Sequence, residues 1–331
     1  MSESQLPLVS VVTPVYNGER YLAECIESVL SQTYQNWEYV VVNNRSTDRT
    51  AEIAAQFAER DARIRLHTAD EFRPIMPNWN YALKQISAQS KYCKILHADD
   101  LLFPACIGQM VEVAEQNPTV GIVGSYRLRT KYVDCTGIPY PTSVLPGSEV
   151  CRASFRKDYY VFGSPSTLLI RSDLVRKRDK FYREDNFHAD LEACFDVLQE
   201  SDFGYVHQVL SYSRLHAGTQ TSTLADPMES RLLEYLGTLK RYGPRYCPTE
   251  EYERCLNSML DRYYRTLAQH ALRLDGPKFW RYQTKGLAKN GFRLNMLRLV
   301  GAVLVKLLDM ALNPKRTIEN LVKRVSKTTH K

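Results

Sequence analysis

The sequence predicts an α/β fold, in which a mostly parallel sheet is flanked by helices, and a helical region after it. Three observations support this prediction. Short apolar runs alternate with segments of helical periodicity over roughly the first hundred residues. Polar clusters directly follow three of these runs. The charge also changes sign along the chain, since residues 228–331 hold 21 Lys and Arg against 9 Asp and Glu, whereas residues 1–227 carry a net charge of −5.

The alternation starts with LVSVVTPV (8–15), an apolar run typical of a buried strand, and GERYLAECIESVLSQ (18–32), whose apolar residues recur at helical spacing. Ser46 or Thr47 is expected to cap the second helix. We expect strands over 8–15, 37–44, 63–68 and 91–98, and helices over 18–32, 46–60 and 78–89. This order is typical of βαβ units with right-handed crossovers around a parallel sheet.

Composition excludes several classes of protein. With 331 residues, 44% hydrophobic and 24% charged, the chain is globular and not disordered. Its eight cysteines form no C-x-x-C pair, which is typical of a reducing compartment. The N-terminal MSESQLPLVS has no basic region leading into an apolar core, so no secretory signal is expected and the predicted location is cytoplasmic. We expect one domain over 1–225 and a basic helical region over 226–331.

Three polar clusters follow predicted strands: PVYNGE (14–19), NNRSTD (43–48) and HADD (97–100). Ligands of open α/β sheets bind outside the carboxyl ends of the strands, so these clusters should converge on one crevice. No G-x-x-x-x-G-K-[ST] and no G-x-G-x-x-G follows any strand, which argues against a P-loop and a dinucleotide fold.

The adjacent carboxylates Asp99 and Asp100 allow two interpretations. In the first, they belong to a solvated turn, or Asp100 caps the helix expected within LLFPACIGQMVEVAEQ (101–116). In the second, the two carboxylates hold a cation, because without one they would repel each other in a crevice. Oxygen ligands favour Mg²⁺ or Mn²⁺, which often complete their coordination with substrate phosphates.

Two segments of the chain resemble the family 2 glycosyltransferases, which have the GT-A fold with a Rossmann-like, mostly parallel central sheet. They are VSVVTPVYNGERYLAECIESVLSQTYQNWEYVVVNNRSTDRTAEI (9–53) and ILHADDLLFP (95–104), and a weaker likeness runs from about 163 to 222. The resemblance implies an inverting enzyme that transfers a sugar from a UDP- or TDP-sugar to a hydroxyl of a saccharide or lipid-linked saccharide. Residues 1–105 would bind the donor and 106–225 the acceptor, in synthesis of a cell-surface polysaccharide or glycoconjugate.

The resemblance also assigns the residues that would contact the nucleotide. The family's P-x-Y-N corresponds to Pro14, Tyr16 and Asn17, which would line the base and ribose. The family's D-D-G-S-T-D appears here as NNRSTD, so Asn43 and Asn44 replace two acids. An amide both donates and accepts hydrogen bonds, so it can still read the edge of a pyrimidine.

The metal motif of the family, Asp-x-Asp, aligns with residues 97–99. Asp99 is then the expected ligand of Mg²⁺ or Mn²⁺, with Asp100 beside it, and His97 would contact either ribose or the metal. The later segment SYSRLHAGTQTS (211–222) resembles the family's R-x-H loop. Arg214 would bind the diphosphate there, and His216 is either a metal ligand or a structural residue.

The catalytic base is expected on FHADLEACFDVLQE (187–200), which resembles the family's acidic pair at the start of a helix. Asp190 would accept the proton of the acceptor hydroxyl, unless it is only an N-cap. The loop Gly163–Ser166 is expected to line the acceptor pocket. The rival carboxylates are Asp185, Glu192 and Asp196, of which the last two should share a solvated face.

The segment LNMLRLVGAVLVKLLDMALNP (294–314) is the most apolar part of the C-terminal region, but Arg298, Lys306 and Asp309 interrupt it. A spanning helix needs about 20 residues with few or no charges. Two readings remain open. Residues 294–331 form either an in-plane helix with a basic tail on an anionic membrane, at the inner face of the cell membrane, or a helix packed on the catalytic domain.

Two other functions compete with sugar transfer. A nucleotidyltransferase would also use a carboxylate and a metal at a strand end, although it would normally show a Gly-rich phosphate loop. A non-catalytic nucleotide-binding scaffold would explain the asparagines of NNRSTD and the histidine of HADD. Nucleic-acid binding is not expected, because no recognised reading motif accompanies the basic tail.

Overall fold

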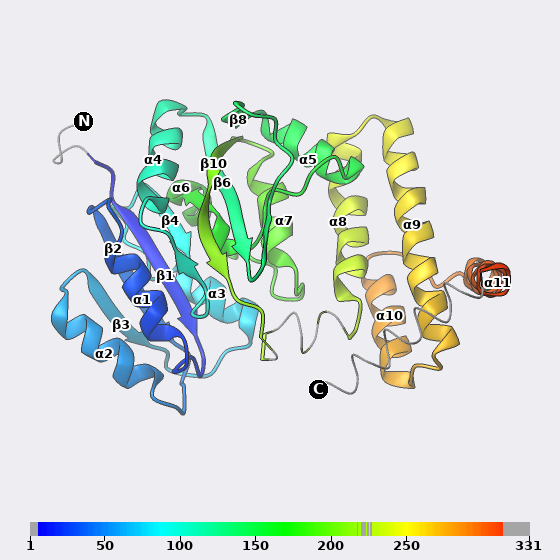
Figure 1. Cartoon of the computed structure of the whole chain (residues 1–331), viewed down its shortest axis with the longest axis horizontal. Coiled ribbons are helices and arrows are strands. Elements are labelled where there is room, and N and C mark those ends of the chain that lie inside the picture. Colours follow the sequence, from blue (N-terminus) through cyan, green and yellow to red (C-terminus); the bar gives the residue numbers. More distant parts are fainter. Residues whose placement is uncertain (1–5, 217, 220–222, 224, 226, 314–331) are drawn as a thin grey trace. The chain divides into compact units, whose positions relative to one another are not determined.

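The computed structural model describes residues 6–313 except 217, 220–222, 224 and 226. The chain divides into two compact units, Met1–Thr223 and Leu224–Lys331. Each unit has its own architecture (Figure 1).

The first four strands are those expected from the apolar runs. They are β1 (Val9–Val15), β2 (Trp37–Asn43), β3 (Ile64–Thr68) and β4 (Tyr92–Ile95). They run parallel in the order β3-β2-β1-β4, so the prediction of βαβ units is confirmed. Their carboxyl ends therefore lie along one edge of the sheet.

The remaining strands extend this sheet. They are β5 (Leu101–Leu102), β6 (Val120–Arg129), β7 (Tyr132–Asp134), β8 (Val144–Leu145), β9 (Leu169–Arg171) and β10 (Asp202–Ser213). β9 pairs antiparallel with both β4 and β6, and thereby joins the two halves, while β10 runs parallel to β6. Within the described residues, the strands form one ten-stranded sheet with the main order β3-β2-β1-β4-β9-β6-β10-β5.

Helices connect the strands of this unit. They are α1 (Leu22–Leu30), α2 (Thr50–Arg60), α3 (Ile75–Leu83), α4 (Cys106–Gln116), α5 (Gly147–Arg156), α6 (Ser172–Arg176) and α7 (Ala189–Val197), with a short 3₁₀ helix η2 at Pro165–Thr167. The expected cap of α2 at Ser46 or Thr47 is wrong. The helix begins at Thr50, and its first N–H donates to the Asp48 carboxylate at 3.0 Å.

The core is centred on β1 and β4, all of whose residues are buried. Burial on both faces is typical of parallel strands covered by helices. Lys94 in β4 is an exception to the apolar pattern, because it is fully buried and its ammonium donates to the Leu168 carbonyl at 3.2 Å. Burial lowers the pKa of Lys94, since the charged form loses its hydration.

The C-terminal unit is helical, as expected. It contains α8 (Ser230–Tyr246), α9 (Thr249–Leu272), α10 (Pro277–Lys289) and α11 (Met296–Leu312). α9 contacts α8 and α11, and α10 contacts α8. Over the part of the chain that the structure describes, no helix combines the length and the apolarity needed to cross a membrane. The basic tail expected to reach a membrane lies outside the described residues from 314 onward.

Candidate active site

The loops after β1 and β2 are joined by hydrogen bonds. Asn17 has a φ of 51°, a left-handed conformation that asparagine adopts more readily than most residues. Its Oδ1 accepts from the Thr47 N–H at 2.8 Å, and its own N–H donates to the Ser46 Oγ at 3.0 Å. The Glu19 N–H donates to the Asp48 carboxylate at 3.0 Å. The first two polar clusters therefore meet, as predicted.

The other residues of the P-x-Y-N motif occupy different environments. Pro14 is buried in β1, where it pairs with Val42 of β2. Tyr16 is 49% exposed, and its ring meets the Phe72 ring edge-on with 5.0 Å between centroids. Tyr16 thus leaves an aromatic face accessible beside the strand ends, while Pro14 belongs to the sheet.

Asn43 and Asn44 are both buried and bonded to backbone groups. The Asn43 Oδ1 accepts from the Ser46 N–H at 3.0 Å. The Asn44 amide donates to the Arg73 carbonyl at 2.8 Å, and its Oδ1 accepts from the Arg73 N–H at 2.9 Å. These amides fix the shape of the loop after β2 and hold it against the loop after β3. Their contact with a nucleotide base stays a prediction.

His97, Asp99 and Asp100 form a compact cluster after β4. One potential ligand atom from each lies within 4.8 Å of the others. Asp100 is only 4% exposed, and burial, followed by the neighbouring Asp99 carboxylate, raises its pKa. The helix-capping alternative is wrong, because α4 begins at Cys106 and the Asp100 carboxylate accepts from the Arg214 N–H at 3.3 Å.

The segment after β10 adds Arg214 and His216 to this cluster. The Arg214 Nε donates to the Asp99 carbonyl at 3.0 Å, and its guanidinium forms an ion pair with Glu24 of α1. The His216 Nε2 lies 3.1 Å from the Asp99 carboxylate, and the His216 Nδ1 accepts from the Gly218 N–H at 3.2 Å. In the neutral ring, Nε2 therefore carries the proton and donates it to Asp99.

The residues of this cluster fit a divalent cation. Two carboxylates stand side by side, and within the described part of the chain the His97 Nε2 is a buried nitrogen without a hydrogen-bond partner. Asp99, Asp100 and His97 offer oxygen and imidazole ligands, and His216 would join them only if its Nε2 gave up the proton that bonds Asp99. Oxygen ligands suit Mg²⁺ and Mn²⁺, and imidazole shifts the preference toward transition metals.

Sequence reasoning missed the aromatic side chain of Trp79, which lies beside this cluster. The Trp79 ring on α3 is 4.6 Å from the His97 ring and 5.4 Å from the Tyr182 ring, measured between centroids. Asn80 fixes the Tyr182 segment through two bonds, from its amide to the Tyr182 carbonyl at 2.7 Å and from the Tyr182 N–H to its Oδ1 at 2.8 Å. Helical periodicity predicted a helix in this segment, but it could not predict that Trp79 would contact His97 and Tyr182.

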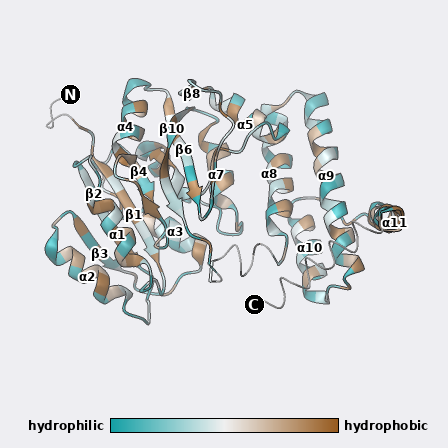
Figure 2. Cartoon of the chain, viewed as in Figure 1, coloured by the Kyte–Doolittle hydropathy of each residue, from teal (hydrophilic) through white to brown (hydrophobic). Residues whose placement is uncertain are grey.

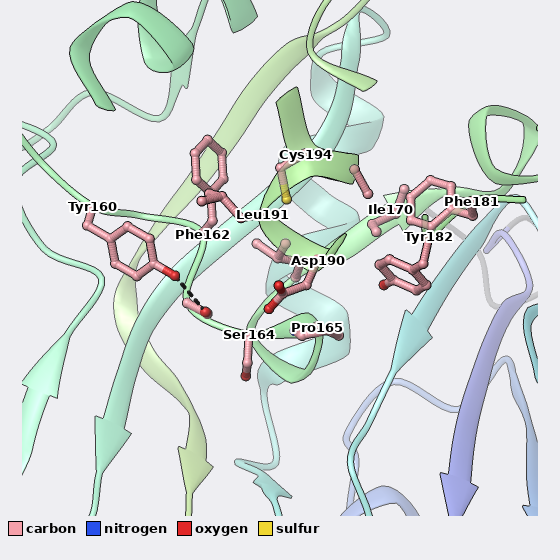
Figure 3. A pocket seen from close by; sticks show the side chains of 13 residues that line it. Tyr160, Phe162, Ser164, Pro165, Ile170, Phe181, Tyr182, Asp190, Leu191 and Cys194 are labelled. Carbon is pink, nitrogen blue, oxygen red and sulfur yellow. Dashed lines mark hydrogen bonds between the residues drawn. The ribbon is translucent and has the colours of Figure 1, made fainter. Parts of the chain in front are cut away.

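Asp190 lines a pocket next to this aromatic group (Figure 3). It is the second residue of α7, whose N-cap is His188, so Asp190 is not merely an N-cap. Among the described lining residues, Asp190 carries the only carboxylate. The others are Tyr160, Phe162, Gly163, Ser164, Pro165, Leu168, Ile170, Phe181, Tyr182, Leu191, Ala193 and Cys194.

The loop before η2 connects the pocket to the cluster after β4. Gly163, Ser164 and Pro165 of the Gly163–Ser166 loop line the pocket, and binding of the acceptor there stays a prediction. Gly163 has a φ of 63°, and a Cβ there would stand 2.6 Å from the Thr167 Oγ1, so this turn requires glycine. Ser166 accepts from the His97 N–H at 3.0 Å. The loop before η2 therefore lines the pocket and is also hydrogen-bonded to the segment that holds His97.

The rival carboxylates are engaged in ion pairs. Glu192, expected on a solvated face, is only 4% exposed, and this expectation is wrong. Its carboxylate accepts from Arg183 at 3.1 Å and from the Asn186 amide at 2.9 Å, which offsets the cost of its burial. Asp185 also pairs with Arg183, at 2.9 Å, and Asp196 pairs with Arg178 at 2.5 Å.

Known proteins that are similar to this chain include glycosyltransferases. Residues 10–148 match the model of glycosyl transferase family 2. An uncharacterized glycosyltransferase of Rickettsia typhi is 29% identical over 237 residues, which cover 71% of this chain and 72% of that protein. One of Haemophilus influenzae is 29% identical over 226 residues, which cover 66% of this chain and 68% of the relative.

Two solved structures share the fold. S. aureus TarS 1–349 in complex with UDP-GlcNAc matches with a TM-score of 0.63 and 16% identity, over 86% of this chain and 80% of that one. The mannosyltransferase PcManGT from Pyrobaculum calidifontis, in complex with GDP-Man and Mn²⁺, matches with a TM-score of 0.55 and 17% identity, over 95% and 84%. The N-terminal unit thus has the GT-A fold, and its residues 10–148 match glycosyl transferase family 2.

Proposed function

We propose that the chain transfers a sugar from a UDP- or TDP-sugar to a hydroxyl of a saccharide or lipid-linked saccharide, with inversion at the anomeric carbon. The observation that carries this proposal is the position of Asp190. Its carboxylate lies in a pocket whose loop is bonded through Ser166 to the segment that holds His97 and Asp99. A proton acceptor and a site for a metal-bound diphosphate thus stand in one structural unit.

The donor would bind across the strand ends. We assign the base and ribose to Pro14, Tyr16, Asn17, Asn43 and Asn44, and the diphosphate to Arg214 with His97 and Asp100 nearby. The exposed ring of Tyr16 supports this assignment, because a base can stack on an accessible aromatic face. The arginine supports it as well, since a guanidinium bonds phosphate oxygens at two points.

Asp99 and His216 would hold Mg²⁺ or Mn²⁺, with His97 and Asp100 beside them. When bound, the cation neutralises the charge that develops on the departing diphosphate. Arg214 contributes positive charge from the protein itself. Its ion pair with Glu24 would have to give way in part for the guanidinium to reach a phosphate.

Asp190 is proposed as the general base. The acceptor oxygen attacks the anomeric carbon from the side opposite the diphosphate, so that a carbon–oxygen bond forms as the bond to the diphosphate breaks. The acceptor hydroxyl gives its proton to the Asp190 carboxylate. Within the described residues, no hydrogen bond or ion pair occupies this carboxylate, whereas Asp185, Glu192 and Asp196 are all paired. This contrast favours Asp190 over its neighbours.

We place this reaction in the synthesis of a cell-surface polysaccharide or glycoconjugate, in the cytoplasm at the inner face of the cell membrane. The contact with an anionic membrane would be made through residues 294–331. No nucleic-acid partner is proposed.

A screen of nucleotide sugars tests the proposal. We expect UDP- or TDP-sugars to raise the melting temperature in the presence of Mn²⁺, and one of them to be hydrolysed slowly without acceptor. Nucleotide binding without turnover of any donor sugar would favour the scaffold alternative instead. Release of pyrophosphate from a nucleoside triphosphate and a sugar phosphate would indicate a nucleotidyltransferase.

A further inference from the structure

α11 exposes an apolar half along its whole length. Successive residues of a helix are rotated by about 100°. On this basis ten residues fall on one half of α11: Met296, Leu297, Val300, Gly301, Leu304, Val305, Leu307, Leu308, Ala311 and Leu312. All ten are exposed, and Leu297 reaches 87%, Leu304 55% and Leu312 78%. Figure 2 shows the hydrophobic colouring of this helix. We refer to these ten residues as the apolar half of α11.

The charged residues of α11 all lie on the opposite half. Leu299 on that half is 6% exposed, and α11 contacts α9. Lys306 and Asp309 form an ion pair of 3.3 Å there. The three charges that interrupt the sequence therefore do not interrupt the exposed apolar surface. In an ordinary amphipathic helix of a globular protein the apolar side faces the core, whereas on α11 the apolar half is exposed.

Large contiguous apolar patches on proteins mark interaction sites, so we expect the apolar half of α11 to bind a partner. The helix has 17 residues and so measures about 25 Å, which suits a position in the plane of a membrane interface better than a transmembrane one. Basic residues flank it in the sequence, with Arg293 before it and Lys315 and Arg316 after it. Long basic side chains can reach lipid phosphates from such positions.

Charge distinguishes between two possible partners of the apolar half, a second copy of the chain and anionic lipid. Residues 228–331 carry 21 Lys and Arg against 9 Asp and Glu, a net charge of +12. A second copy of the chain would bring the same positive charge against itself. Anionic lipid attracts basic segments with about 1 kcal/mol per Lys or Arg near the surface. The charge therefore favours lipid over self-association.

We propose that the apolar half of α11 inserts into the interface of an anionic bilayer and holds the chain there as a peripheral protein. The insertion is specific to this half, since the opposite half buries Leu299 and carries the three charged residues of the helix. It deepens the membrane contact proposed above for residues 294–331. Because it needs neither donor nor acceptor, its failure would leave the proposed transfer reaction standing.

Co-sedimentation of the full-length chain with vesicles, without nucleotide sugar, tests this proposal. The probes are vesicles of phosphatidylcholine alone and vesicles that also contain phosphatidylglycerol. The variants are Leu297→Asp and Leu304→Asp on the apolar half. Leu274→Asp is the matched control, because Leu274 belongs to the same unit, is 88% exposed and lies outside α11. Its φ of 57° is one that aspartate tolerates.

We expect the parent chain to sediment with the anionic vesicles, less so as salt rises, and only weakly with phosphatidylcholine alone. Each apolar-half variant should weaken binding by ~10-fold or more, because a carboxylate resists entry into lipid. The control should bind like the parent, and all three variants should keep the parent's melting temperature.

Three results would overturn the proposal. The first is equal binding by Leu304→Asp and the parent, or no binding by either. In the second, light scattering detects a dimer that Leu304→Asp splits, which would make a second copy the partner. In the third, Leu304→Asp lowers the melting temperature while Leu274→Asp does not, which would mean that the apolar half packs within the chain.

Discussion

The site of the N-terminal unit is assembled from side chains far apart in the sequence, whereas the apolar half of α11 comes from seventeen consecutive residues. Asp99 and His216 are separated by 117 positions, and Glu24 and Arg214 by 190. Each of these site residues contacts one particular residue from a distant segment, and residues adjacent in sequence cannot take over that contact. In α11 many similar side chains contribute in parallel, so the loss of one should be tolerated better than the loss of a site residue.

The two units also differ in what they bury. The N-terminal unit buries polar groups such as Asp100, Glu192 and Lys94 and bonds them within the protein, while α11 leaves leucines in water. Burial of a polar group costs free energy unless the group is hydrogen-bonded. Asp100, Glu192 and Lys94 each have a bonding partner that offsets this cost, whereas the exposed leucines of α11 have no partner in the described chain. The predictions below test this contrast in order of expected effect.

The largest expected effect is on turnover. Asp190→Asn keeps the size of the side chain but removes the base, so kcat should fall by at least ~10²-fold while donor affinity stays within a few-fold of the parent. Steady-state kinetics on a verified acceptor and calorimetry with the donor measure the two quantities. Asp185→Asn is the control, because its carboxylate is exposed and paired with Arg183. Near-normal turnover in Asp190→Asn would mean that another group is the base.

The second effect is on metal-dependent binding. Asp99→Ala should weaken Mn²⁺-dependent nucleotide binding by ~10- to 100-fold or more and leave the fold intact, since Asp99 is the partly exposed carboxylate that meets His216. His216→Ala should act in the same direction but less strongly, because it removes one neutral ligand. Calorimetry with nucleotide and Mn²⁺ measures both. An unchanged affinity in Asp99→Ala would contradict the assignment.

The third effect is smaller and concerns Trp79. Because its ring contacts both His97 and Tyr182, Trp79→Ala should lower kcat/KM by about 3- to 10-fold, the equivalent of one aromatic contact of ~0.5–1.5 kcal/mol. Trp79→Phe should recover most of this loss. If both variants behave like the parent, Trp79 fills space without positioning the site.

The smallest effect compares one lysine from each unit. Lys94→Met should raise the free energy of unfolding at neutral pH, because the buried ammonium loses its hydration and methionine has no charge to bury. Lys306→Met should be almost neutral, since the Lys306–Asp309 pair is partly exposed. Chemical denaturation of the two variants measures both changes. If Lys94→Met is the less stable of the two, its bond to the Leu168 carbonyl outweighs the cost of burial.

The pH dependence of the parent gives an independent check on Lys94. Its folded pKa is lowered, so above that folded pKa the unfolded chain binds more protons at this position than the folded one. Stability should therefore rise with pH from the lowered pKa up to the ordinary lysine pKa of 10.5. The Lys94→Met variant should lack this rise, and the Lys306→Met variant should retain it.

The local pattern of the sequence was enough for much of the fold. Apolar runs bounded by polar clusters predicted β1, β2, β3 and β4, because strands of a parallel sheet are buried on both faces. The meeting of PVYNGE and NNRSTD followed from the rule that parallel strands end at one edge. The apolar character of α11 was likewise visible in its residues, although its exposure was not.

The partner of each side chain was decided only by the tertiary structure. Glu192 was expected in solvent but is buried against Arg183, and the hydrogen bond from His97 to Ser166 joins residues 69 positions apart. Trp79 had no signal that would place it beside the strand ends. A sequence pattern reports periodicity within one element, whereas these contacts depend on how α3, α7 and the loop before η2 pack on the sheet. The sequence by itself determined the first four strands, the polar clusters and the apolar helix. Packing between distant segments decided that Asp185, Glu192 and Asp196 are paired with arginines while Asp190, within the described residues, is not.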